Sequence, residues 1–198
     1  MLLPPSDTHF KPQDWIFYQL LQYTTAQDLC TNFRTAIDCG GHVGIMTHRM
    51  AMNFAEVHVY EPVHILLLKT NTVNYPNIVY HDNAVGDKEC IVNMTLNLTN
   101  SGDNRVTDQG EITVLQKTID SLNCTTVDFI KMDIQGNELS ALQGAEQTIM
   151  QCRPVMMIEI ENDDPNRQTI HNLLQGWGYK LHFKKNADHI FVDTRKNK

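Results

Sequence analysis

The sequence contains no long apolar run, no excess of basic residues and no paired cysteines. No stretch approaches the roughly 20 apolar residues that a membrane-spanning helix needs, and the first residues lack the basic and apolar parts of a secretory signal. With 23 acidic against 16 basic residues, the net charge of -7 disfavours binding to nucleic acid or to anionic membranes. We therefore expect a cytoplasmic protein without nucleic-acid or membrane partners.

Cysteine, glycine and proline are also scarce. The five cysteines are widely spaced and form no Cys-x-x-Cys pair, which disfavours a zinc or dithiol redox site. The 10 glycines and 7 prolines form no repeat or low-complexity stretch. A chain of 198 residues that is 41% hydrophobic can bury one sizeable core but not two. We predict a single domain over residues 1–198.

The apolar residues predict an alternation of short strands and helices. Residues 1–34 are predicted to be a helical lead, with a helix from Asp14 to about Cys30 that covers a sheet edge or the binding pocket. The core of the domain follows over 35–198, with strands at 35–38, 57–60, 78–80, 127–132 and 155–158 and helices at 45–54, 63–73, 137–150 and 166–177. This order predicts an α/β fold, a doubly wound and mostly parallel sheet with helices on both faces.

Two segments depart from this alternation. Residues 91–115 show period-two alternation around the polar loop 100–105, which predicts an inserted antiparallel pair of strands. The segments 179–184 and 189–193 are separated by a short polar link, which predicts a C-terminal antiparallel hairpin at the edge of the sheet.

In an open α/β sheet, ligands bind beyond the carboxyl ends of the strands, so the residues after each strand are the first candidates. The segment 38–44 follows the first strand and contains three glycines. Gly40 and Gly41 allow a tight turn against a ligand, and Gly44 allows the next helix to pack closely. The Asp-x-Gly-x-x-x-Gly spacing of this segment, from Asp38 to Gly44, suits a cofactor whose amino-acid moiety contacts the loop.

The same loop disfavours a dinucleotide. Counted from Gly40, the second and third glycines of a dinucleotide fingerprint would stand at the positions of His42 and Ile45. A nicotinamide-dependent oxidoreductase is therefore disfavoured. His42 is a candidate for binding the carboxylate of the cofactor or for bonding the loop itself.

Polar residues also follow the second and third strands. Glu61 ends the second strand, where an acid can accept hydrogen bonds from ribose hydroxyls. With Pro62 in the first helical turn, the carboxylate could instead favour the helix dipole. Asn83 and Ala84 follow the third strand, where a polar and a small residue could receive adenine.

Ionisable residues gather at the ends of the fourth and fifth strands. Lys131 and Asp133 cross from a buried strand to its end, and Glu138 falls in the first turn of the next helix. Glu138 is a candidate for substrate binding, or it simply favours the helix dipole. Glu159 follows the apolar strand 155–158 and is expected on the same rim as Asp133.

These motifs together resemble the FkbM family of methyltransferases. The family pattern is Asp-x-Gly-Ala-Asn/His-x-Gly, an acid followed by proline, Thr/Ser-x-Asp-x-Leu, Lys-x-Asp-x-Glu-Gly-x-Glu, and a late proline and glutamate. The chain has all five in order, at 38–44, 61–62, 118–122, 131–138 and at Pro154 with Glu159. The resemblance implies a seven-stranded, Rossmann-like class I fold, S-adenosylmethionine as cofactor, and O-methylation of a hydroxyl on a sugar, glycan or related small molecule.

Methyl transfer to a hydroxyl needs a base or a metal ion to ease loss of the proton. We expect Asp133 to act as the base, with Glu159 and Lys131 as further catalytic residues and His42 as an alternative base. Asp133 also borders the cofactor, and a divalent metal held by Asp133 and Glu159 is possible although no further ligands support it. Arg105, in the loop 100–105, is a candidate anchor for an anionic acceptor.

The chain departs from the family pattern at two positions. Gly41 replaces alanine, which a tight turn tolerates. Gln135 stands where the family has glutamate, and an amide can neither act as a base nor neutralise a cation. The alternative function is therefore a protein that binds S-adenosylmethionine with lost or altered catalysis.

Overall fold

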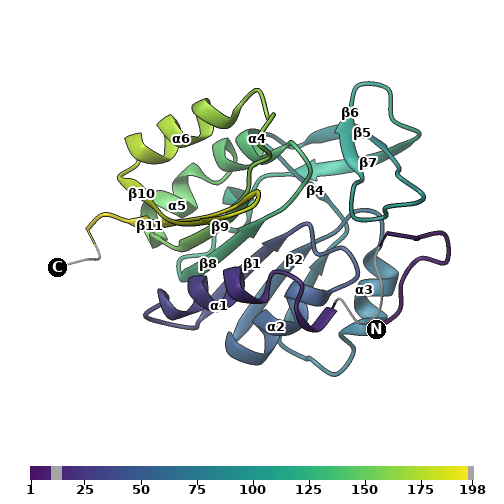
Figure 1. Cartoon of the computed structure of the whole chain (residues 1–198), viewed down its shortest axis with the longest axis horizontal. Helices are drawn as coiled ribbons and strands as arrows, with labels where there is room; N and C mark the ends of the chain where they lie inside the picture. Colours follow the sequence, from purple (N-terminus) through teal and green to yellow (C-terminus); the bar gives the residue numbers. More distant parts are fainter. Residues whose placement is uncertain (10–14, 196–198) are drawn as a thin grey trace.

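A seven-stranded sheet forms the centre of the computed structural model, which describes residues 1–9 and 15–195 (Figure 1). The strand order is β10-β11-β9-β8-β1-β2-β3, and β11 runs antiparallel to both of its neighbours while the other pairs are parallel. The strands are β1 (Thr35–Cys39), β2 (Glu56–Tyr60), β3 (Ile78–His81), β8 (Val127–Met132), β9 (Val155–Glu159), β10 (Tyr179–Lys185) and β11 (Asp188–Asp193). The predicted doubly wound sheet and its C-terminal hairpin are confirmed.

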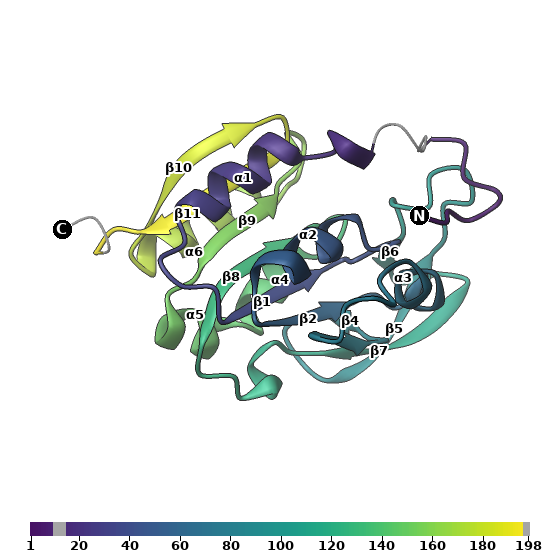
Figure 2. The ribbon, with the colours of Figure 1, turned by 90° about the horizontal axis from the view of Figure 1, so that it is seen from below.

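Helices cover both faces of this sheet (Figures 1 and 2). One face carries α1 (Leu20–Asp28), α2 (Ile45–Asn53) and α3 (Ile65–Asn71), and the other carries α4 (Glu138–Gln143), α5 (Glu146–Cys152) and α6 (Arg167–Gly176). Every residue of β1 and β8 is buried, as expected for central parallel strands covered on both sides. The charged Asp38 and Lys131 of these strands are therefore buried as well.

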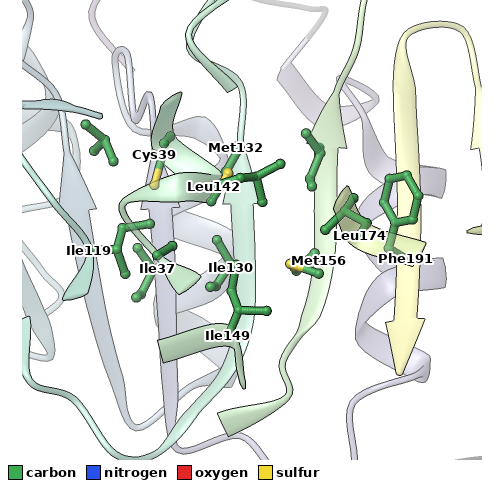
Figure 3. Close-up of a cluster of buried hydrophobic side chains, with 14 of the residues drawn as sticks. Ile37, Cys39, Ile119, Ile130, Met132, Leu142, Ile149, Met156, Leu174 and Phe191 are labelled. Carbon is green, nitrogen blue, oxygen red and sulfur yellow. The ribbon is translucent and has the colours of Figure 1, made fainter. Parts of the chain in front are cut away.

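The core divides into two clusters, one on each face of the sheet. Tyr23, Met50 and Leu68 contribute to the cluster under α1, α2 and α3. Leu142 and Leu174 belong to the other cluster, where Figure 3 shows them with side chains of β1, β8, β9 and β11. Since alternate strand residues point to opposite faces, Asp38, Lys131 and Glu159 share the face that α1 and α2 cover.

The N-terminal helix is shorter than predicted. It begins at Leu20, and the expected start at Asp14 lies outside the described residues. Its apolar side chains are only partly covered, because Phe17 before the helix and Leu21 within it are 75% and 51% exposed while Tyr23 is buried. Helix α1 instead packs across β9 and β11, where its Gln22 side chain donates a 2.9 Å hydrogen bond to Asp188.

The predicted helix 137–150 is two helices. Helix α4 ends at Gln143, Gly144 follows it, and α5 begins at Glu146. A Cβ at Gly144 would lie 2.0 Å from the backbone oxygen of Gly86, so the chain between the helices packs directly on the inserted segment. A continuous helix is therefore replaced by a break at this glycine.

The insertion is larger than the predicted antiparallel pair. Four strands form a second sheet in the order β4-β7-β5-β6, and the 3-10 turn η2 (Asp120–Leu122) follows it. They are β4 (Ala84–Val85), β5 (Cys90–Thr95), β6 (Arg105–Thr107) and β7 (Ile112–Lys117). β5 pairs antiparallel with β6 and β7, as an antiparallel insertion requires, and the unpredicted β4 adds in parallel to β7. Within the described ranges, we find no helix of the length and apolarity that spanning a membrane would require.

Candidate active site

A cavity of about 310 Å³ lies at the carboxyl ends of the parallel strands, beneath the loop that joins β5 to β6. This is where an open α/β sheet places its ligands. Ten of the residues predicted from the sequence line it, namely Gly40, Gly41, His42, Glu61, Pro62, Asn83, Ala84, Lys131, Asp133 and Glu159. The structure thus brings together residues from the ends of β1, β2, β3, β8 and β9.

The glycine loop after β1 is fixed from both sides. The amides of Gly40 and Gly41 donate hydrogen bonds of 3.0 and 3.1 Å to the carbonyl of Tyr60. Gly40 has φ +83°, and a Cβ there would lie 2.0 Å from the Asp133 backbone oxygen, so only glycine fits. Gly44, at φ +99°, begins α2 without lining the cavity. Its role is to set the path of the loop.

Beneath the glycine loop, Lys131 lies between two carboxylates. Register pairs Asp38 of β1 with Lys131 of β8, and the Lys131 ammonium lies 3.6 Å from Asp38 Oδ1 and 3.3 Å from Asp133 Oδ2. Asp38 does not line the cavity, and its other oxygen accepts a 2.6 Å hydrogen bond from Thr47. Burial favours the neutral form of Lys131, but Asp133 and Asp38 outweigh it and raise the pKa above its ordinary value. Lys131 is therefore charged.

Glu61 is buried at the end of β2, and both of its oxygens accept backbone hydrogen bonds. Oε1 accepts from the amides of Val63 and His64 at 2.8 Å, and Oε2 accepts from the amide of His42 at 2.9 Å. The carboxylate thus joins the turn before α3 to the glycine loop. Oε2 keeps a further lone pair, and Glu61 lines the cavity together with Pro62. Ribose binding by Glu61 stays a prediction.

His42 connects the glycine loop to the cover of the cavity. Its Nε2 lies 2.7 Å from Ser101 Oγ, and the Ser101 hydroxyl in turn donates to the carboxylate of Asp7. Burial, followed by the nearby His64, lowers the pKa of His42 to about 4. The ring is therefore neutral at pH 7, and its backbone adopts the left-handed conformation at φ +49°. A general-base role for His42 stays a prediction.

The cover consists of the β5–β6 loop and the N-terminal segment, which lie side by side (Figure 2). The amides of Thr8 and His9 donate to the carbonyl of Thr99 at 3.0 and 3.2 Å. Residues 100–104 of the predicted recognition loop line the cavity, but Arg105 does not. Its guanidinium pairs instead with Asp103 at 2.7 Å. The structure therefore places the proposed anion anchor away from the site.

Glu138 also lies outside the cavity wall. Its two carboxylate oxygens accept 3.0 Å hydrogen bonds from the amides of Ile134 and Gly136, which closes the loop between β8 and α4. Burial raises the pKa of Glu138 to about 7. These hydrogen bonds give the buried Glu138 carboxylate a role in holding the loop. Substrate binding by Glu138 stays a prediction.

Asp133, Gln135 and Glu159 form the polar end of the cavity. The Gln135 amide nitrogen donates to Asp133 Oδ1 at 2.9 Å and to Glu159 Oε2 at 2.8 Å. Burial and the charge of Asp133 raise the pKa of Glu159 to about 10. Burial acts on Asp133 in the same direction, but Lys131 outweighs it and holds the pKa of Asp133 below its ordinary value. At neutral pH, Asp133 is ionised and Glu159 carries a proton.

Tyr18 is a site residue that the sequence did not reveal. It lines the cavity, and burial together with the charge of Asp133 raises the pKa of its hydroxyl. The buried guanidinium of Arg49 on α2 donates to the carbonyls of Trp15, Ile16 and Tyr18, which fixes this segment on the domain. Because those bonds reach backbone oxygens, no side-chain pattern in the sequence could have identified Tyr18.

Metal ligands do not gather in the part of the chain that the structure describes. No group of three or more histidine, cysteine, aspartate or glutamate side chains is arranged there to hold a metal ion. The carboxyl groups at the site are instead paired with Lys131 and with Gln135.

Comparison with known proteins agrees with this arrangement. The family model described as "Methyltransferase FkbM domain" matches residues 38–181, which is more than half of the chain. A comparison with curated proteins gave no significant match.

Several solved structures share the fold. A methyltransferase FkbM from Methylobacillus flagellatus is 21% identical, with a TM-score of 0.61 over 80% of this chain and 43% of its own. The present chain thus spans less than half of that protein. A ribosomal protein L11 methylase from Lactobacillus delbrueckii is 12% identical, with a TM-score of 0.57 over 96% of this chain and 83% of its own. A putative RNA methyltransferase from Pyrococcus horikoshii is 11% identical, with a TM-score of 0.54 over 92% of this chain and 91% of its own.

Proposed function

Because the chain belongs to the FkbM methyltransferase family, we propose that its cavity binds S-adenosylmethionine and transfers the methyl group to a hydroxyl of a sugar, glycan or related small molecule. The observation that carries the proposal is that one cavity is lined by Glu61, Asn83 and the glycine loop together with Asp133 and Glu159. One structural neighbour, a putative methyltransferase from Streptococcus mutans, is in complex with SAH.

The residues at one end of the cavity fit this cofactor. The buried carboxylate of Glu61 can accept hydrogen bonds from ribose hydroxyls, and Asn83 with Ala84 offers an amide and a small side chain to the adenine ring. The backbone of Gly40 and Gly41 lines the wall that faces the amino-acid moiety. When bound, S-adenosylmethionine would supply a methyl group on a cationic sulfur.

The residues at the other end can prepare the acceptor. Lys131 pairs with one oxygen of Asp133 and Gln135 donates a hydrogen bond to the other, which fixes the position of this carboxylate. The ionised Asp133 can then accept the proton of an acceptor hydroxyl. Lys131 does not itself remove a proton, because it is charged; it keeps Asp133 ionised. Positioning of the acceptor in the cavity supplies a further part of the rate.

The charges at this end favour one class of acceptor. Asp133, Glu159 and Glu161 all line the cavity, whereas Lys131 is already engaged by Asp38 and Asp133. A phosphate or carboxylate on the acceptor would lie close to these carboxyl groups. Within the described cavity wall, no free cation offsets the resulting repulsion. We therefore expect neutral sugars and amino sugars as acceptors, and not sugar phosphates or uronic acids.

The test is transfer of a radiolabelled methyl group from S-adenosylmethionine to a panel of neutral, amino, phosphorylated and uronic-acid glycosides. The proposal predicts labelling of a neutral or amino sugar, and at least a hundredfold loss in Asp133→Asn. Gln143→Glu, an exposed change on α4, serves as a control and should keep the activity. Preferential labelling of a phosphorylated sugar would contradict the acceptor class.

The alternative is a protein that binds the cofactor without methyl transfer. Gln135 favours it, because an amide stands where the family pattern has a carboxylate. Binding of S-adenosylmethionine with no transfer to any acceptor of the panel would support this alternative.

A further inference from the structure

Gln135 adopts a backbone conformation that turns its side chain back onto the strand ends. It has φ +57° and is followed by Gly136 at φ +99°, so two successive residues between β8 and α4 are left-handed. This conformation is uncommon for a residue other than glycine, asparagine or aspartate. The Glu138 carboxylate holds the turn by accepting hydrogen bonds from the amides of Ile134 and Gly136.

The amide group of Gln135 joins two carboxyl groups from different strands. One amide nitrogen donates to Asp133 at the end of β8 and to Glu159 at the end of β9, at 2.9 and 2.8 Å. Both hydrogens of the amide are thereby used. In this orientation the nitrogen end of the amide faces both carboxyl groups.

Two carboxyl groups in a buried site repel when both are ionised, and here the proton on Glu159 and the Lys131 ammonium, 3.3 Å from Asp133 Oδ2, already offset this repulsion. What remains for Gln135 is to fix the relative position of the two groups. The Gln135 amide supplies donors at the point where a cation would lie. A glutamate side chain at this position would instead add a third carboxylate. Three carboxylates around one point form the oxygen-rich ligand set that hard divalent cations prefer.

We propose that Gln135 is a positioning residue that holds Asp133 and Glu159 together in place of a divalent cation, so that this site works without a metal ion. The single change Gln135→Glu would convert it into a divalent-cation site. The catalytic part of this inference rests on the proposed methyl transfer, whereas the cation part does not.

Calorimetric titration with Mn²⁺ alone tests the cation part. We expect Gln135→Glu to bind Mn²⁺ at least tenfold more tightly than the wild type, and the added Asp133→Asn change to abolish the gain. Gln143→Glu, which adds the same charge on the exposed side of α4, should show no gain. Equal binding by Gln135→Glu and the wild type, or tight binding by the wild type, would overturn the proposal.

Methyl transfer tests the catalytic part. We expect wild-type activity to be insensitive to a chelator, and Gln135→Glu to depend on Mn²⁺. In Gln135→Asn, whose shorter amide keeps the left-handed backbone accessible but cannot reach both carboxyl groups, kcat should fall at least tenfold, with the KM for S-adenosylmethionine unchanged. The acid limb of its pH profile should move to higher pH, because Asp133 loses a hydrogen bond to its ionised form.

A chelator-sensitive wild type, or a Gln135→Asn variant with full activity and an unmoved profile, would contradict the proposal. If no acceptor is methylated by any form, the proposed function fails while the Mn²⁺ titration still decides the cation part. Thermal unfolding of each variant shows whether the fold is retained.

Discussion

At the scale of single residues, Lys131 is the charge on which the buried part of the site depends. Its ammonium group contacts Asp38, Asp133 and the carbonyl of Gly40 while the side chain is 3% exposed. Breaking a buried ion pair by removing one partner leaves an uncompensated charge, which is more costly than the pair itself is stabilising. Removal of the ammonium therefore leaves two carboxylates without their cation.

We predict that Lys131→Met lowers the free energy of unfolding by about 3–5 kcal/mol at pH 8. The defect should shrink toward pH 5, because the unpaired carboxylates have raised pKa values in the folded variant and favour folding once they bind protons. Urea unfolding at both pH values measures this. Lys180→Met, an exposed change on β10, is the matched control, and an equal effect of the two substitutions would contradict the account.

Several site residues could be predicted from the sequence because strand ends meet at one rim of a parallel sheet. Lys131, Asp133 and Glu159 were identified in this way, and they line one cavity. Gln135 was interpreted only as a missing carboxylate, since its bridge depends on a left-handed backbone that the sequence does not reveal. Gly41 was interpreted as a harmless replacement of the family's alanine, and the packing explains a glycine here, because a Cβ would lie 2.3 Å from a methyl of Val59.

At the scale of elements, the break between α4 and α5 locks the inserted sheet onto the domain. The apolar pattern of 137–150 is continuous and predicts one helix, but a close backbone contact decides the structure. Gly144 approaches Gly86, next to β4, and its carbonyl accepts a 2.9 Å hydrogen bond from the amide of Asp120. A contact between segments distant along the chain is not encoded in local periodicity.

We predict that Gly144→Ala destabilises the protein by about 1–3 kcal/mol, because its methyl group would overlap the Gly86 carbonyl and force a backbone shift. Gly176→Ala is the control, since a Cβ there meets nothing within 4 Å at the end of α6. Its stability should be unchanged or slightly raised. Chemical unfolding compares the two, and a Gly144→Ala variant as stable as the wild type would show that the contact is not tight.

At the scale of the whole molecule, the alternation of strands and helices predicted the layers correctly, and the hairpin predicted the antiparallel edge. The order of the seven strands was not predicted, since the positions of strands along the chain do not give their order in space. The second sheet was only half predicted, because β4 and β6 have two and three residues and leave no periodic signal.

The pH dependence of stability includes a contribution from a histidine remote from the cavity. His189 on β11 is fully buried, and burial, followed by nearby Lys184 and His171, lowers its pKa to about 4. Between about pH 4 and its ordinary pKa of about 6.5, the unfolded chain binds a proton that the folded chain does not. Folding is therefore disfavoured as the pH falls through this range.

We predict that the wild type gains stability relative to His189→Phe as the pH rises from about 5 to about 7, by roughly 2 kcal/mol. Urea unfolding of both proteins across this range measures the difference, and phenylalanine keeps a ring beside Phe191. A difference that does not change with pH would mean that His189 titrates alike in the folded and unfolded chains.

The central claim is that the cavity at the strand ends binds S-adenosylmethionine. Calorimetric titration with its product, S-adenosylhomocysteine, tests this most directly because no acceptor is needed. We predict saturable binding at one site per chain, lost in Gly40→Ala, whose new side chain would overlap the end of β8, and retained in Gly176→Ala. Absence of binding by the folded wild-type protein, or equal binding by Gly40→Ala, would contradict the account.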